Sequence, residues 1–119
     1  MGKFFSSRVT SFSHAFRSLF HTLKYEKNSW IHLFVTIVVI MAGFFFKISQ
    51  FEWMVIILTI TGVWTAELIN TALENTVDLI TIEKNSYAKT AKDVMAAMVL
   101  VSAIGAIVIG MIIFIPYIF

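Results

Sequence analysis

The sequence predicts an all-α membrane protein in which an N-terminal amphipathic surface helix precedes three transmembrane helices. Of its 119 residues, 59% are hydrophobic and 13% are charged, and the mean hydropathy of +0.87 lies well above that of ordinary soluble domains. Three segments approach the roughly 20 helical residues that cross a hydrocarbon core. None shows the two-residue alternation of a barrel strand. We expect a single domain over 1–119, with a surface helix at about 4–25 and spans at about 28–46, 52–81 and 90–117.

The segment at about 4–25 has the pattern of a basic amphipathic helix. Its apolar residues recur at three- and four-residue steps with basic residues between them, which is typical of a helix lying on a membrane surface. Charges interrupt the apolar residues, so a signal peptide is not expected. The apolar positions are Phe5, Val9, Phe12, Phe16, Leu19, Phe20 and Leu23.

Basic residues predict the orientation of the chain. The connection between the first two spans holds one, Lys47, whereas the N-terminal segment and the 81–93 loop are both rich in lysine and arginine. We therefore expect the N-terminus and the 81–93 loop on the cytoplasmic side of a membrane. The residues concerned are Lys3, Arg8, Arg17, Lys24, Lys27, Lys84, Lys89 and Lys92.

The second span carries polar residues that a simple membrane helix lacks. Glu67, Asn70, Glu74 and Asp78 are separated by three, four and four residues, so they fall on one helix face, which we call the polar seam. A rise of 1.5 Å per residue places Glu67 roughly 22 Å from Glu52, inside the membrane. Carboxylates at such depth usually mark function, whereas a solvated helix end is the alternative interpretation nearer the water.

Two further segments are expected to meet the polar seam. Glu26 precedes the first span at a depth similar to that of Glu74, and two carboxylates from different helices suit a hard divalent cation such as Mg²⁺. Magnesium sites of this kind usually also bind phosphate, which indicates a nucleotide. Lys89, Lys92 and Asp93 lead into the third span, although Lys89 and Asp93 also have the spacing of a simple helical ion pair.

Several chemistries are absent from the sequence. It contains no cysteine, which excludes disulfides and thiolate sites. It also lacks the phosphate-binding loop, the dinucleotide fingerprint, the zinc-protease motif and the nucleophile elbow of soluble enzymes. No nucleic-acid partner is expected. Four glycines within the spans are expected to ease helix packing, namely Gly43, Gly62, Gly105 and Gly110.

Several motifs together resemble the small integral-membrane lipid kinases of bacteria, the diacylglycerol kinase family. They are "KYEKNSWIH" (24–32), "AELINTALENTVDLI" (66–80) and "AKTAKD" (88–93). Two further segments, "AGFFFKISQFEW" (42–53) and "IIFIPY" (112–117), are similar to the family's Gram-positive branch, whose members act as undecaprenol kinases. The resemblance covers nearly the whole chain.

This resemblance implies a homotrimer whose active sites are shared between neighbouring protomers and which phosphorylates a membrane lipid alcohol with MgATP. It implies that Glu67 is the catalytic base and that Glu26 and Glu74 bind the metal. As residues of the polar seam, Glu67 and Asn70 are also expected to bind the lipid substrate. The nucleotide contacts that the resemblance implies are Glu26, Glu74, Glu83, Lys84, Asn85, Lys92, Asp93 and His14.

The sequence departs from the family in the nucleotide loop and leaves alternatives open. The family commonly has tyrosine and histidine at Lys84 and Asn85, which leaves ATP or GTP as the phosphoryl donor. Undecaprenol and diacylglycerol both offer a primary hydroxyl, so either is a candidate acceptor. A small transporter or channel subunit is the alternative of a different class. Three helices are too few to cover the polar seam, so a homo-oligomer is expected from burial alone.

Overall fold

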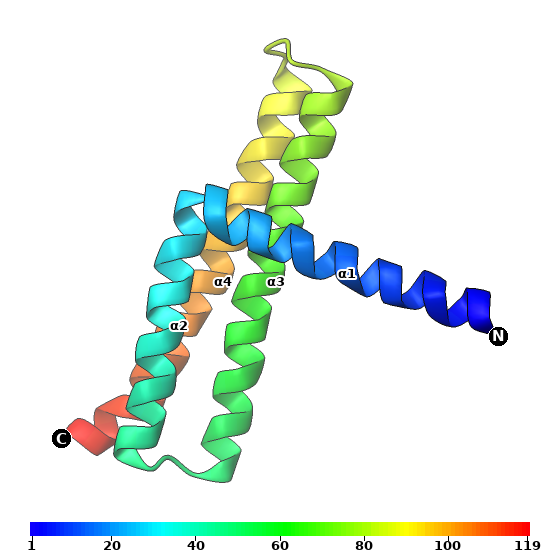
Figure 1. Cartoon of the computed structure of the whole chain (residues 1–119). Helices are drawn as coiled ribbons and strands as arrows, with labels where there is room; N and C mark the ends of the chain where they lie inside the picture. The colour runs from blue at the N-terminus through cyan, green and yellow to red at the C-terminus, as the bar shows by residue number, and fades with distance from the viewer. The chain divides into compact units, whose positions relative to one another are not determined.

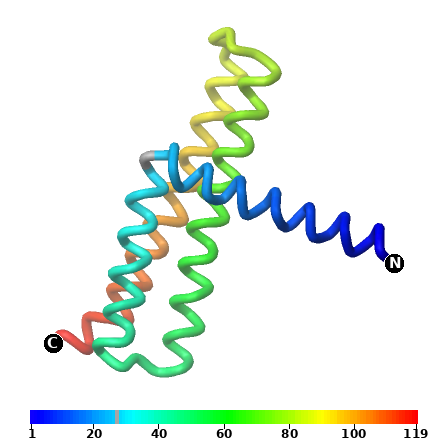
Figure 2. Tube along the Cα trace, in the orientation of Figure 1, coloured from blue at the N-terminus to red at the C-terminus, as the bar shows by residue number. Residues whose placement is uncertain are grey.

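The computed structural model describes residues 1–26 and 28–119 (Figure 2). Within this part of the chain there are four helices and no strand. Three of them are long and apolar enough to cross a membrane, which confirms the all-helical class with three candidate spans. Lys27, one of the residues used to predict orientation, lies outside the described residues. The helices are α1 (Gly2–Tyr25), α2 (Lys27–Phe46), α3 (Gln50–Ile80) and α4 (Ser86–Ile118).

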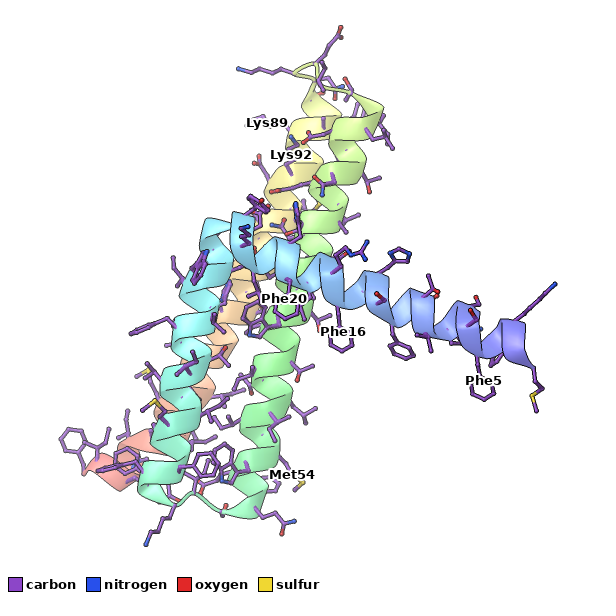
Figure 3. All side chains as sticks on the ribbon, in the orientation of Figure 1. Phe5, Phe16, Phe20, Met54, Lys89 and Lys92 are labelled. Carbon is purple, nitrogen blue, oxygen red and sulfur yellow. The ribbon has the colours of Figure 1, made fainter. Side chains whose placement is uncertain are left out.

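The chain divides into two units, Met1–Val35 and Thr36–Phe119, and the prediction of a single domain remains a prediction. In the first unit α1 ends at Tyr25, and the extended backbone of its C-cap residue Glu26 (φ −93°, ψ 120°) separates α1 from α2. The phenylalanines of α1 are exposed, and Phe5, Phe16 and Phe20 project from the same side of the helix (Figure 3). A surface position for α1 also remains a prediction.

In the second unit, the start of α3 is fixed by a capping box. The Ser49 hydroxyl accepts a hydrogen bond from the Glu52 backbone N–H at 3.1 Å, and the Glu52 carboxylate accepts one from the Ser49 N–H at 2.9 Å. Each bond satisfies a backbone donor that a helix start leaves without a partner. The Tyr117 hydroxyl, near the end of α4, also donates to Glu52. The first turn of α3 is therefore joined to the last turns of α4.

A small apolar cluster packs the same end of the second unit. Its buried centre consists of Ile48, Ile56 and Ile113, from the α2–α3 turn, α3 and α4. Trp53 packs beside this centre with its ring centroid 4.9 Å from that of Phe44. Elsewhere most large apolar side chains of the three long helices are exposed on the single chain, as expected for surfaces that meet lipid or other protomers.

Of the four glycines in the spans, one lies at a close contact within the chain. A Cβ atom on Gly43 would lie 2.6 Å from Cη2 of Trp53, whereas nothing within 4 Å would meet a Cβ on Gly62, Gly105 or Gly110. The expected role in helix packing therefore holds within this chain for Gly43 alone.

Two further contacts position the central part of α3. The Trp64 indole N–H donates to the Thr36 hydroxyl at 3.0 Å, which joins α2 to α3 one turn before Glu67. α3 and α4 pack along each other (Figure 1).

α4 begins at Ser86, four residues before the predicted boundary, because the Asn85 side chain caps it by accepting from the Ala88 N–H.

Candidate functional site

The polar seam lies on one continuous helix and passes from buried to exposed side chains. α3 runs unbroken for 31 residues, so the predicted spacing keeps the four side chains on one face. Glu67 is only 2% exposed. Asn70 and Glu74 are partly buried, and Asp78 is exposed. The seam therefore leads from a buried carboxylate to exposed side chains near the α3–α4 loop. Such an arrangement connects the interior of the helices with the water-exposed end of the molecule.

Asn70 has a buried polar atom beside Glu67. Its side-chain oxygen makes no hydrogen bond within the described residues, although a buried polar group ordinarily has a partner. Asn70 follows Glu67 by three positions, which places the two on the same face of α3. The Asn70 side chain is therefore a candidate for contact with a polar group bound at this point.

At the exposed end of the seam, α3 and α4 are joined by an ion pair. Nζ of Lys92 lies 2.7 Å from Oδ1 of Asp78, with the two side chains 44% and 52% exposed. The predicted approach of the 87–93 segment to the seam is therefore present at this point. The short N–O distance is that of a charge-assisted hydrogen bond.

The α3–α4 loop forms one wall of a pocket of about 520 Å³. Two side-chain oxygens fix the conformation of this loop. The Thr81 hydroxyl accepts a hydrogen bond from the Glu83 N–H at 3.1 Å, and the Asn85 side-chain oxygen accepts one from the Ala88 N–H at 2.8 Å. Lys92 and Asp93 line the pocket from α4. Other lining residues include Asp78, Glu83, Lys84, Asn85 and Lys89. Five of the predicted nucleotide contacts thus line one pocket.

Lys89 and Asp93 form the helical ion pair that their spacing allowed. Their charged atoms are 3.7 Å apart, and the side chains are 81% and 69% exposed. Such an exposed pair at i and i+4 contributes little to stability. It requires no function beyond a solvated helix surface.

The remaining predicted residues belong to the first unit. His14 is exposed on α1, and Glu26 is partly buried at the end of that helix. A cation shared by Glu26 and Glu74 therefore remains a prediction. Across the described residues no group of three or more histidine, aspartate and glutamate side chains gathers around a possible ion. Two carboxylates completed by phosphate oxygens remain the expected arrangement.

The sequence did not predict the partner of Lys92. Asp78 was identified as part of the seam, but without a role of its own. The sequence feature that could have predicted this pair is the position of Asp78 three residues before the loop, with the basic residue Lys92 after the same loop. Opposite charges on the two helices of a hairpin are candidates for pairing wherever the long lysine side chain can reach.

Comparisons with known proteins agree with the predicted resemblance. A family model described as "Prokaryotic diacylglycerol kinase" matches residues 13–114. The chain is 43% identical over 106 residues to an undecaprenol kinase of Bacillus subtilis, covering 89% of this chain and 86% of that protein. It is 35% identical over 103 residues to a diacylglycerol kinase of Synechocystis, covering 86% of this chain and 59% of that protein.

Proposed function

This chain belongs to the prokaryotic diacylglycerol kinase family and is a lipid kinase, and from this premise we propose that it transfers the γ-phosphoryl group of MgATP to undecaprenol. The choice of acceptor is supported by the higher identity, 43%, to a protein named undecaprenol kinase. Diacylglycerol is the second candidate, supported by the relative named diacylglycerol kinase.

The observation that carries the proposed chemistry is the buried carboxylate of Glu67. It is 2% exposed and lies on a helix long enough to cross a membrane. As the base, Glu67 accepts the proton of the lipid hydroxyl while that oxygen attacks the γ-phosphorus. The bond from the γ-phosphorus to the bridging oxygen breaks, and ADP leaves with that oxygen. Asn70 holds the same lipid hydroxyl by donating from its side-chain N–H to the hydroxyl oxygen, since the one hydroxyl proton goes to Glu67. Both side chains then serve the acceptor rather than the nucleotide.

The nucleotide occupies the exposed end of the seam in this proposal. Lys92 neutralises charge on the phosphates, and Asp93 together with Glu83, Lys84 and Asn85 contacts the nucleotide from the pocket wall. Phosphoryl transfer depends mainly on positioning and electrostatics, so few residues suffice. His14 is proposed as a further contact from α1.

The carboxylates of Glu26 and Glu74 fit a magnesium ion by their chemistry. Glu74 is partly buried on the seam, between Asn70 and Asp78, and carboxylate oxygens are the ligands that hard cations prefer. When bound, magnesium neutralises phosphate charge and orients the γ-phosphate. Glu26 at the end of α1 and Glu74 on α3 would hold the ion, and Glu67 remains the proton acceptor.

The proposed setting is a bacterial cell membrane that the chain crosses three times. The excess of lysine and arginine before α2 and in the 81–93 segment supports a cytoplasmic position for both, since basic residues favour that side. The exposed phenylalanines of α1 support a helix lying on the membrane surface. A homotrimer is proposed, because neighbouring protomers can cover the polar seam.

A transporter or channel subunit is less well supported. An ion path needs polar groups across both halves of the membrane, yet residues 53–64 contain no ionisable side chain. The first half of α3 instead packs around Ile56. The polar seam therefore leads to a buried site and not through the membrane.

Transfer of a radiolabelled γ-phosphoryl group tests the proposed function. Purified protein receives labelled ATP with undecaprenol or with diacylglycerol, side by side, at matched acceptor concentrations. The expected result is preferential labelling of undecaprenol. Preferential labelling of diacylglycerol would reverse the choice of acceptor, and labelling of neither would contradict both. Unlabelled GTP added as a competitor measures the preference between nucleotides.

A further inference from the structure

The ion pair of Asp78 and Lys92 joins the two helices that form the nucleotide pocket. Asp78 lies in the last turn of α3, and Lys92 lies in the second turn of α4. Both residues line the pocket, and their charged atoms are 2.7 Å apart. Lys92 has a part in the proposed reaction, whereas Asp78 does not.

A lysine that binds phosphate benefits from being held in place. Its charge is carried on a flexible stem with four carbons, so an unrestrained ammonium group occupies many positions. The Asp78 carboxylate restricts Lys92 to the α3 side of the pocket. An ammonium group has three N–H donors, so a bond to Asp78 leaves two for phosphate oxygens.

We propose that Asp78 is a positioning residue that holds the Lys92 ammonium group where the nucleotide phosphates bind. This inference rests on the proposed function, because it assigns Lys92 to the nucleotide. Although Asp78 also lines the pocket, it serves the nucleotide indirectly. It acts through the carboxylate–ammonium contact seen across the α3–α4 hairpin.

A purely structural role for the pair is less well supported. Both side chains are about half exposed, and an ion pair open to water stabilises a protein little. α3 and α4 are already joined by the Ile56 and Ile113 cluster and by the Tyr117–Glu52 hydrogen bond. The Asp78–Lys92 ion pair at the loop end therefore adds little to the stability of the fold. It does, however, restrict the position of the Lys92 side chain.

The test compares Asp78→Asn with the wild type in steady-state kinetics. Asparagine keeps the size of the side chain and removes its charge. We expect KM for ATP to rise roughly tenfold, as for the loss of a charge-assisted hydrogen bond, with KM for the lipid unchanged. Asp78→Glu restores the carboxylate and should recover part of the loss. An unchanged KM for ATP in Asp78→Asn would overturn the inference.

Glu52→Gln is the matched control, because Glu52 makes the other polar tie between α3 and α4. It should lower the thermal stability of the protein in detergent without changing KM for ATP. Equal kinetic effects of Glu52→Gln and Asp78→Asn would show that any loosening of the two helices weakens nucleotide binding, which would contradict a specific role for Asp78.

A double-mutant cycle separates this inference from the proposed function. Lys92→Met should itself raise KM for ATP, and adding Asp78→Asn to it should have no further effect, because the group that Asp78 positions is gone. A full additional loss would mean that Asp78 acts without Lys92, and the inference would be wrong. A normal KM in Lys92→Met would instead remove Lys92 from the nucleotide site and overturn the inference with it.

Discussion

Glu67 is the residue on which the proposed chemistry depends. It is almost fully buried, although a carboxylate within an apolar helix is costly to keep. Ala66, the residue before it, is also buried, and Thr71 follows one turn later, donating to the Glu67 carbonyl at 3.1 Å. A buried carboxylate on a helix of this kind is typical of a functional site.

Glu67→Gln should abolish lipid phosphorylation and leave nucleotide binding intact. Glutamine matches the shape of glutamate but cannot accept the hydroxyl proton, and general-base catalysis contributes on the order of 10²–10⁴ in rate. The measurements are labelled phosphate transfer and titration with MgATP. Near wild-type turnover in this variant would remove Glu67 from the mechanism. Glu52→Gln, on the same helix, is the control and should keep its turnover.

Glu26 and Glu74 should behave as one unit toward the metal. Each alanine substitution is expected to weaken MgATP binding, and the double variant should lose little beyond the worse single variant, since two ligands of one ion act together. Nucleotide titration over a range of magnesium concentrations measures both the affinity and its metal dependence. Independent and additive losses would argue that the two carboxylates do not share a cation.

At the scale of the helices, the approach of α2 to α3 depends on the absence of a side chain at Gly43. The Trp53 ring occupies the space that a Cβ atom on Gly43 would need. This ring also contacts the Phe44 ring and packs against the apolar cluster that contains Ile48. The fit lies next to the turn that contains Lys47, whose φ of 51° is unusual for a residue other than glycine.

Gly43→Ala should destabilise the protein by about 1–3 kcal/mol, as overpacking does in a close contact. The added methyl group would lie 2.6 Å from the Trp53 ring, so the ring or the helix has to move. Thermal unfolding in detergent is the measurement. Gly62→Ala is the matched control: its Cβ meets no atom within 4 Å, and the higher helix propensity of alanine should leave stability equal or raised. Equal losses in both would contradict the packing account.

Much of the helical structure could be predicted from the sequence, because apolar length alone identifies spanning segments. The early start of α4 could not be predicted in this way, because residues 86–91 have little apolar character. The first turn of the helix depends there on the Asn85 cap. The seam could be predicted because the spacing fixes one face of a helix. The contacts of Lys92 and Tyr117 could not, because they depend on how α3 and α4 pair in space.

At the scale of the whole molecule, we propose an active site that is shared between chains. Glu67 and Glu74 are assigned to the same helix, whereas Glu26 belongs to the first unit. Three helices leave much apolar surface open on the single chain. In the proposed trimer, neighbouring protomers cover this surface, and one of them supplies Glu26.

Mixing two inactive variants tests shared sites. Co-assembly of Glu67→Gln with Glu26→Ala protomers should regenerate some sites that contain neither substitution, provided that Glu67 and Glu26 of one site come from different chains. The expected result is activity above that of both parents, measured as labelled phosphate transfer. Each variant mixed with itself is the control. A mixture that stays inactive, with co-assembly established by pull-down of two tags, would place each complete site within one chain.

The capping box at Ser49 has a consequence for the way in which two immiscible substrates meet. It fixes the point at which α3 begins, and the 31 residues that follow form a rod about 46 Å long. That rod exceeds a hydrocarbon core of about 30 Å, so it must project into water or tilt. A thinner or thicker bilayer changes the depth at which Glu67 lies, but leaves its distance from Asp78 along the rod unchanged. In the proposed reaction, the distance between the lipid end and the nucleotide end of the seam is therefore set by the protein, whatever lipid surrounds it.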